Sequence, residues 1–135
     1  MTIKILLLIR VQVPHDVAPK GRENKGDYIS YRALLVTVGP LFGKKKKNVP
    51  VGYEIGRQTF TNAEDATMKS TATFPGQGTI RLRGAMTSVK NGLLRVPIVG
   101  GTGKFQGARG ELVMGPGDTR WVNTYHLRLP ESGIA

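Results

Sequence analysis

The chain has 135 residues, 20 Lys and Arg against nine Asp and Glu, a formal net charge of +11 and no cysteine. This length predicts one domain over residues 1–135, and the missing cysteine excludes disulfides, thiolate zinc sites and cysteine nucleophiles. The 18 glycines accompany a normal share of apolar residues, which indicates a turn-rich globular protein rather than a disordered one.

The charge and the N-terminal segment bear on partners and location. The apolar run between Lys4 and Arg10 is too short for a signal-peptide core or a membrane span, so we expect a soluble, cytoplasmic protein. A strongly basic balance favours an anionic partner. However, lysines gather only at residues 43–48, which Pro and Gly mark as a loop, and aromatic residues do not alternate with the other cations. This pattern disfavours nucleic acid as the partner.

Apolar and polar residues alternate with a period of two along most of the chain, which predicts strands, and no window has a helical stripe. Gly, Pro, Asn and Asp separate these segments by short connections, so neighbouring strands are expected to be antiparallel. Eight short antiparallel strands predict an all-β protein, either a closed eight-stranded barrel of lipocalin-like size or a sandwich. The expected strands cover residues 2–13, 29–38, 51–61, 66–74, 78–88, 93–100, 108–115 and 120–129.

Residues 96–112, VPIVGGTGKFQGARGEL, contain five glycines that alternate with apolar and charged residues. Glycine allows positive φ and close approach of another backbone, so these residues are expected at turns and bends of the barrel. Phe105 is expected to close one barrel end. A phosphate cradle is disfavoured because no helix follows the glycines.

Four segments of this chain resemble the allene oxide cyclase and dirigent family of small eight-stranded antiparallel barrels. The segments are GDYISY at 26–31, VPVGYEIGRQTF at 49–60, GQGTIRLRG at 76–84 and VGGTGKFQGARGE at 99–111. The resemblance implies isomerisation of an unstable epoxide, steering of a radical coupling, or folding of a polyketide chain for cycloaddition. It also implies dimers or trimers, and a dry cavity that needs no metal or cofactor.

Candidate site residues in the first half follow from alternation and from this resemblance. In the first strand, we expect Leu6, Leu8, Arg10 and Gln12 to face the cavity and Ile3, Ile5, Leu7, Ile9 and Val11 to face outward, where they would need a partner protein. The plant cyclases carry Glu and Asn where this chain has Arg10 and Gln12. Arg10 would hold an acidic or enolate group of the substrate; alternatively, it reaches water at the barrel rim. Tyr31 matches an aromatic residue near the family's reacting centre, and Gln58 would add a hydrogen bond.

Candidates in the second half lie on the last two strands. Trp121, Asn123 and Tyr125 share one face of the last strand, which offers rings and hydrogen-bonding groups to a ligand. The alternative is that Trp121 and Tyr125 are ordinary core aromatics. Arg109 and Glu111 share a face of the strand before, either as an inward charged pair or on the surface.

These observations favour a cofactor-independent cyclase or isomerase with a flexible, largely apolar, oxygenated substrate of polyketide or lipid type. Arg10, Tyr31 and Tyr125 are its predicted catalytic residues. The predicted substrate-binding residues are Gln12, Gln58, Arg109, Trp121 and Asn123. Two alternatives remain open: a non-catalytic stereo-directing or ligand-binding barrel, and a basic barrel that binds nucleic acid.

Overall fold

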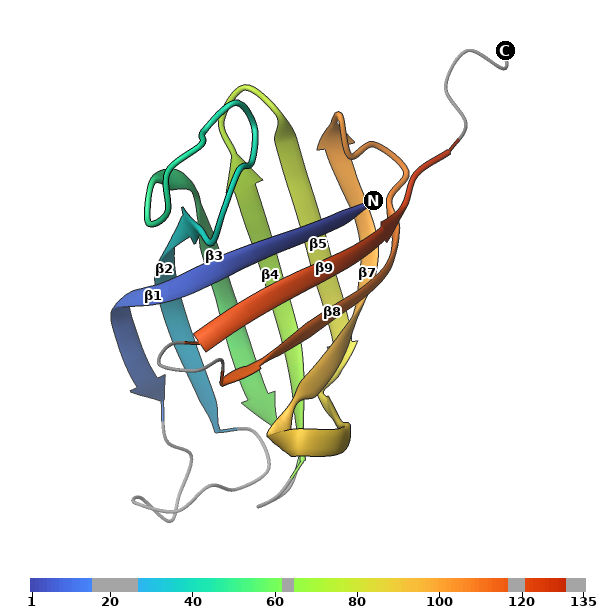
Figure 1. Ribbon diagram of the computed structural model, residues 1–135. Coiled ribbons are helices and arrows are strands. Elements are labelled where there is room, and N and C mark those ends of the chain that lie inside the picture. Colours follow the sequence, from blue (N-terminus) through green and yellow to red (C-terminus); the bar gives the residue numbers. More distant parts are fainter. Residues whose placement is uncertain (16–26, 62–64, 117–120, 131–135) are drawn as a thin grey trace.

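The computed structural model describes residues 1–15, 27–61, 65–116 and 121–130 (Figure 1). The described residues form antiparallel strands and one single-turn 3₁₀ helix, as the period-two alternation predicts. The elements are β1 (Thr2–His15), β2 (Tyr28–Thr37), β3 (Pro50–Phe60), β4 (Ala66–Phe74), β5 (Gly78–Ala85), β6 (Thr87–Ser88), η1 (Lys90–Gly92), β7 (Leu94–Gly103), β8 (Arg109–Pro116) and β9 (Trp121–Arg128).

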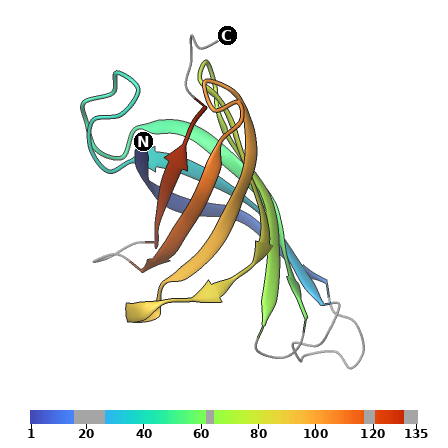
Figure 2. The ribbon, with the colours of Figure 1, turned by 90° about the vertical axis from the view of Figure 1, so that its right-hand side faces the viewer.

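The eight long strands close into an antiparallel barrel, so the barrel and not the sandwich is confirmed. The strand order is β5-β4-β3-β2-β1-β9-β8-β7, and pairing of β5 with β7 closes the ring. The two-residue strand β6 pairs only with the start of β7, across the 3₁₀ turn. Figures 1 and 2 show β1, β9 and β8 crossing one side of the barrel and β2 to β5 forming the other. No helix of the described residues is long and apolar enough to cross a membrane.

The expected orientation of β1 is wrong for its first half. Ile3 and Ile5 were expected outside, but they are 1 % and 0 % exposed and belong to the core. The pairing of β1 with β2 shifts between Ile9 and Val11, which leaves Arg10 as the extra residue of a β-bulge. A bulge reverses which alternate residues face inward. The inward face therefore changes from odd to even numbers at Arg10, so Ile3 and Ile5 do not belong to the predicted outward apolar face, whereas Val11, beyond the bulge, does face outward.

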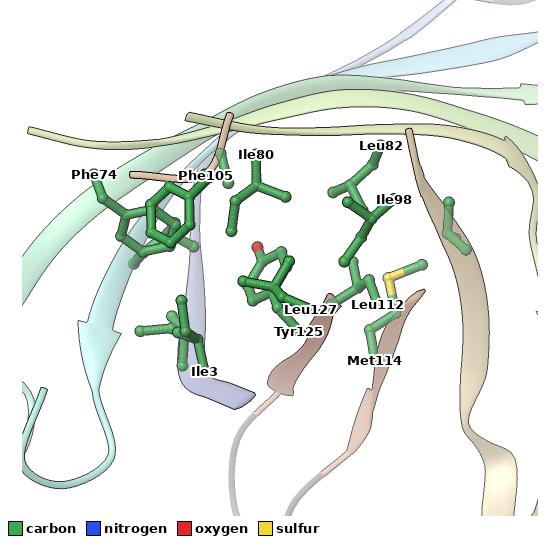
Figure 3. Close-up of a cluster of buried hydrophobic side chains, with 14 of the residues drawn as sticks. Ile3, Phe74, Ile80, Leu82, Ile98, Phe105, Leu112, Met114, Tyr125 and Leu127 are labelled. Carbon is green, nitrogen blue, oxygen red and sulfur yellow. The ribbon is translucent and has the colours of Figure 1, made fainter. Parts of the chain in front are cut away.

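An aromatic cluster fills the end of the barrel opposite the β1 bulge. The rings of Phe74 and Phe105 lie 5.8 Å apart, and the ring of Phe42 contacts both, at 5.5 and 6.3 Å. Figure 3 shows Phe74 and Phe105 side by side, with Ile80 and Tyr125 next along the barrel interior. Phe105 is fully buried, so the glycine-rich segment does deliver it into the barrel end as expected.

Gly110 shows what the glycines of this segment contribute. Its φ of 140° lies where L side chains are strained, and a Cβ there would collide with the backbone carbonyl oxygen of His126. The glycine thus lets β8 approach β9 closely near the end of the barrel. The requirement is structural, as the sequence predicted.

Candidate functional site

A carboxyl group lies buried inside the barrel between two tyrosines. Glu54 is fully buried on β3 and accepts a hydrogen bond at each carboxyl oxygen. The Tyr31 hydroxyl, on β2, donates to Oε2 at 2.7 Å, and the Tyr125 hydroxyl, on β9, donates to Oε1 at 2.9 Å. The two tyrosines come from strands separated by β1, so the carboxyl group links distant parts of the sheet.

Alternation along β3 explains how an acidic residue comes to lie inside. Tyr53, Ile55 and Arg57 are exposed, whereas the residues between them turn inward. Gly56 is one of these, and a Cβ at this position would meet the hydroxyl of Tyr31 and the Cβ of Ser70. Glycine therefore leaves the space through which the Tyr31 hydroxyl reaches Glu54.

The hydrogen-bond network continues from Tyr125 along β9. The side-chain amide of Asn123 donates to the Tyr125 hydroxyl at 3.4 Å, and the Trp121 indole N–H donates to Asn123 Oδ1 at 3.1 Å. Each donor points toward the next group, and the chain ends at the Glu54 carboxyl. Such networks fix the rotamers of their members.

Burial controls the protonation of this cluster. Desolvation raises the pKa of Glu54, and the hydrogen bonds from Tyr31 and Tyr125 offset this effect only in part. Burial and the nearby Glu54 charge also raise the pKa values of both tyrosines, so their hydroxyls remain protonated donors. The buried Ser70 hydroxyl lies close to Tyr31 and Glu54 and forms no hydrogen bond of its own to described residues. It can accept a hydrogen bond from the carboxyl O–H of a neutral Glu54.

The cluster faces a cavity of about 260 Å³ near the β1 bulge. This volume is at the small end of ligand pockets. Half of the lining is apolar and half offers polar or amphipathic groups, an arrangement that suits one small molecule with an oxygen-bearing group. The lining residues are Leu7, Ile9, Ile29, Met68 and Met114, with Gln12, Tyr31, Glu54, Gln58 and Trp121.

Six of the eight residues predicted for the site lie together. Four of them, Gln12, Tyr31, Gln58 and Trp121, line the cavity, whereas Tyr125 and Asn123 lie behind it and are fully buried. Figure 3 shows the Tyr125 ring among aliphatic side chains, so this residue is both a core aromatic and a member of the polar cluster. Their roles in binding or catalysis remain predictions.

Arg10 and Arg109 lie elsewhere, which corrects two placements. Arg10 is exposed because it is the extra residue of the β1 bulge. Of its two predicted positions, in the cavity or in water, it therefore takes the one in water. Arg109 is exposed at the start of β8, where its guanidinium donates to the backbone carbonyl of Ala108 at 2.8 Å. Glu111 lies on the surface too, 3.4 Å from Arg95.

Glu54 is the functional candidate that the sequence predictions missed. In the segment VGYEIGRQTF the outward residues Tyr53 and Ile55 are more apolar than the inward Gly52, Glu54 and Gly56, so hydrophobic alternation points to the wrong face. The available signal was that Glu54 is the only acidic residue within the four strands β2 to β5. Among the described residues, no three metal-ligating side chains are grouped to hold a metal ion.

The raised pKa of Glu54 predicts an unusual dependence of stability on pH. Between the ordinary pKa of 4.5 and the higher value in the barrel, the folded protein binds a proton that the unfolded chain has lost. The free energy of unfolding should therefore fall as pH rises through this interval, by about 1.4 kcal/mol per pH unit, and then level off. Urea unfolding from pH 4 to 9 should show this fall in the wild type relative to Glu54→Gln. Parallel curves for the two proteins would contradict the raised pKa.

Comparisons with known proteins establish the type of barrel. No protein-family model and no curated protein sequence matches this chain. Its fold is similar to that of pyocyanin demethylase, with a TM-score of 0.75 and 23% identity over 95% of this chain and 100% of that one. It is also similar to two pterocarpan synthase dirigent proteins, with TM-scores of 0.62 and 20% identity, over 97% and 94% of this chain and 86% and 92% of theirs. These likenesses confirm the dirigent-like barrel fold that the sequence motifs predicted.

Proposed function

We propose that this protein is a cofactor-independent isomerase or cyclase that binds a small, flexible, largely apolar molecule inside its barrel. The observation that carries the proposal is the buried Glu54 carboxyl, which is held between Tyr31 and Tyr125 and lines a cavity of mixed apolar and polar groups. A buried acid whose pKa is raised, facing a cavity, is typical of general acid–base sites.

The cluster has the parts that acid-assisted ring closure or isomerisation needs. A neutral Glu54, or Tyr31 supported by it, donates a hydrogen bond or proton to a substrate oxygen and makes the adjacent carbon more electrophilic. A hydroxyl or carbon of the same substrate then loses its proton to the carboxylate, so no proton is gained or lost overall. The apolar side chains of the cavity wall hold the substrate in a reactive conformation. Such positioning alone lowers activation barriers by about 7–11 kcal/mol in favourable cases.

The lining also narrows the substrate class. Arg10 is outside, and among the described residues no cation lines the cavity to hold a carboxylate. A second buried carboxylate beside Glu54 would be repelled or protonated. The reacting group is therefore a neutral oxygen, such as a carbonyl, epoxide or hydroxyl, with Gln12 and Gln58 available to hydrogen-bond a further oxygen. This revises the acidic end group that Arg10 had led us to expect.

The test is to incubate polyketide-like and oxygenated lipid compounds with the protein alone and to follow their conversion. Acceleration over the uncatalysed reaction, with loss of acceleration in Glu54→Gln, is the expected result. If the Glu54→Gln variant accelerated the reaction as much as the wild type does, Glu54 would have no part in the mechanism.

A second candidate is a barrel that binds or orients a reactive intermediate without accelerating its reaction. The likeness to the two dirigent proteins favours it, because dirigent proteins in the family that the motifs resemble steer a coupling without performing the oxidation. The same incubation separates the two: a changed product ratio at an unchanged rate supports this candidate. Accelerated disappearance of the starting compound supports the enzyme.

Ligand binding has a built-in reporter. Trp121 is the only tryptophan, and it lines the cavity with 37 % of its surface exposed. A ligand that enters the cavity should exclude water from the indole and shift its fluorescence emission to shorter wavelength. The matched control is Met68→Trp in a Trp121→Phe background, which moves the reporter to another lining residue. Saturable shifts from both reporters, with similar dissociation constants, are expected; a response from Trp121 alone would place the ligand outside the cavity.

A further inference from the structure

Three cations stand in one row across the outer wall of the barrel. Arg57 on β3 lies directly opposite Lys69 on β4, and Lys69 lies directly opposite Arg83 on β5. All three side chains are exposed. Neighbouring strands are about 4.8 Å apart, so the row places three positive charges within about 10 Å.

This row costs the barrel stability when no anion is bound. Like charges directly opposite one another on neighbouring strands are destabilising. The strands β2 to β5 contain one acidic residue, Glu54, and it points inside the barrel. An external anion would offset the repulsion that the strands themselves do not offset.

The row adjoins a hollowed apolar surface. A depression of about 710 Å³ crosses the outer wall from β1 to β4, and Arg57 and Lys69 line it together with Arg32. Beside these cations Val11, Val13 and Ile55 are 52 %, 44 % and 47 % exposed and line the same depression. The surface thus presents positive charge and aliphatic side chains together.

The row is also close to the mouth of the ligand cavity. Gln58 and Met68 line the cavity and are the sequence neighbours of Arg57 and Lys69, which point to the opposite face of the same strands. Figure 1 shows β3 ending and β4 beginning at the barrel end away from the 38–49 connection, which carries the loop lysines. A surface bound by the row would therefore lie beside the cavity mouth.

We propose that this outer wall docks the protein onto the anionic surface of a lipid bilayer. Lipid phosphates bind the Arg57, Lys69 and Arg83 row, and Val11, Val13 and Ile55 contact the interfacial region. Basic residues beside exposed apolar side chains suit an anionic membrane. A second copy does not fit, because cations would face cations. Nucleic acid fits less well, because the exposed side chains beside the row are aliphatic, and the nearby Tyr28 ring is already covered by the Arg57 guanidinium, 4.4 Å from the ring centroid.

The test is co-sedimentation with vesicles of phosphatidylcholine, with and without phosphatidylglycerol, at physiological salt. We expect binding only when phosphatidylglycerol is present. Each Lys or Arg near such a surface contributes a factor of about five, so the triple variant Arg57→Gln, Lys69→Gln, Arg83→Gln should bind roughly 100-fold more weakly. The control is Lys45→Gln, Lys46→Gln, Lys47→Gln, which removes the same charge from the exposed loop and should lose much less affinity.

Three results would overturn the proposal: equal losses in the two triple variants, equal binding to both kinds of vesicle, or tighter binding to a single-stranded RNA oligonucleotide that the row variant also loses. Thermal unfolding provides a readout besides binding. Because the variant removes repulsion between opposed cations, its melting temperature should equal or exceed that of the wild type, so weak binding cannot be attributed to unfolding. None of the residues changed in the two triple variants belongs to the proposed catalytic cluster, so either assignment can fail without the other.

Discussion

Glu54→Gln should lower the rate constant of ring closure or isomerisation about 10²- to 10⁴-fold, the range that a positioned general acid or base contributes. Gln has nearly the same shape and keeps a carbonyl oxygen that one tyrosine hydroxyl can bond, but it neither donates nor accepts a proton in the reaction. Binding, measured by Trp121 fluorescence, should change far less than the rate. Stopped-flow or quenched-flow measurement under single-turnover conditions gives the rate constant of the chemical step.

Two further variants separate acid catalysis from a disturbed barrel. Tyr31→Phe removes one hydrogen bond to Glu54 at 2.7 Å while keeping the ring, and it should also lower the rate constant, though less than Glu54→Gln. Glu111→Gln removes an acid that lies on the surface beside Arg95, and it should leave the rate constant unchanged. If Glu54→Gln retained full activity, or if Glu111→Gln lost as much, Glu54 would not be the catalytic acid.

Gly110→Ala should destabilise the barrel by about 3 kcal/mol, because it combines a strained backbone conformation with a steric clash. The φ of 140° is unfavourable for alanine, and its Cβ would overlap the carbonyl oxygen of His126 on the neighbouring strand. Backbone atoms cannot rotate away as a flexible side chain can, so β8 and β9 must separate locally. Equilibrium urea unfolding measures the loss in free energy of unfolding, and the melting temperature should fall by roughly 10 °C.

Gly39→Ala is the matched control for this substitution. A Cβ at Gly39 meets no atom within 4 Å, and its φ is not in the region that favours glycine. Its free energy of unfolding should change by less than about 0.5 kcal/mol, as for most surface substitutions. Similar losses at the two positions would show that general glycine flexibility, rather than the close approach of β8 to β9, explains the glycine-rich segment.

The docking surface and the cavity use opposite faces of the same strands. Alternation sends Gln58 inward and Arg57 outward on β3, and it does the same with Met68 and Lys69 on β4. A barrel whose mouth lies beside an anionic bilayer would receive apolar molecules directly from the lipid phase. The vesicle experiment tests the docking surface, and the Glu54 variants test the cavity separately.

The amino-acid sequence by itself was sufficient for most of the strands, and the resemblance of its motifs to a family of small barrels favoured the barrel over the sandwich. Period-two alternation, short turn segments and the glycine-rich stretch predicted eight antiparallel strands, because these signals depend on neighbouring residues only. The same local rule placed the Trp121, Asn123 and Tyr125 face inside, whereas Tyr31 was predicted from the family resemblance. These strands have no bulge near those residues, so every second residue continues to point to the same face of the sheet.

The tertiary structure alone decided the two points that matter most for the site. The bulge at Arg10 moved that side chain out of the barrel and turned Ile3 and Ile5 inward, and it depends on how β1 pairs with β2 rather than on the sequence of β1. Glu54 is buried because Tyr31 and Tyr125, 23 residues before it and 71 residues after it, supply a hydrogen bond to each carboxyl oxygen. An acidic side chain is kept inside a barrel only when hydrogen-bond partners lie beside it, and only closure of the sheet brings these partners together.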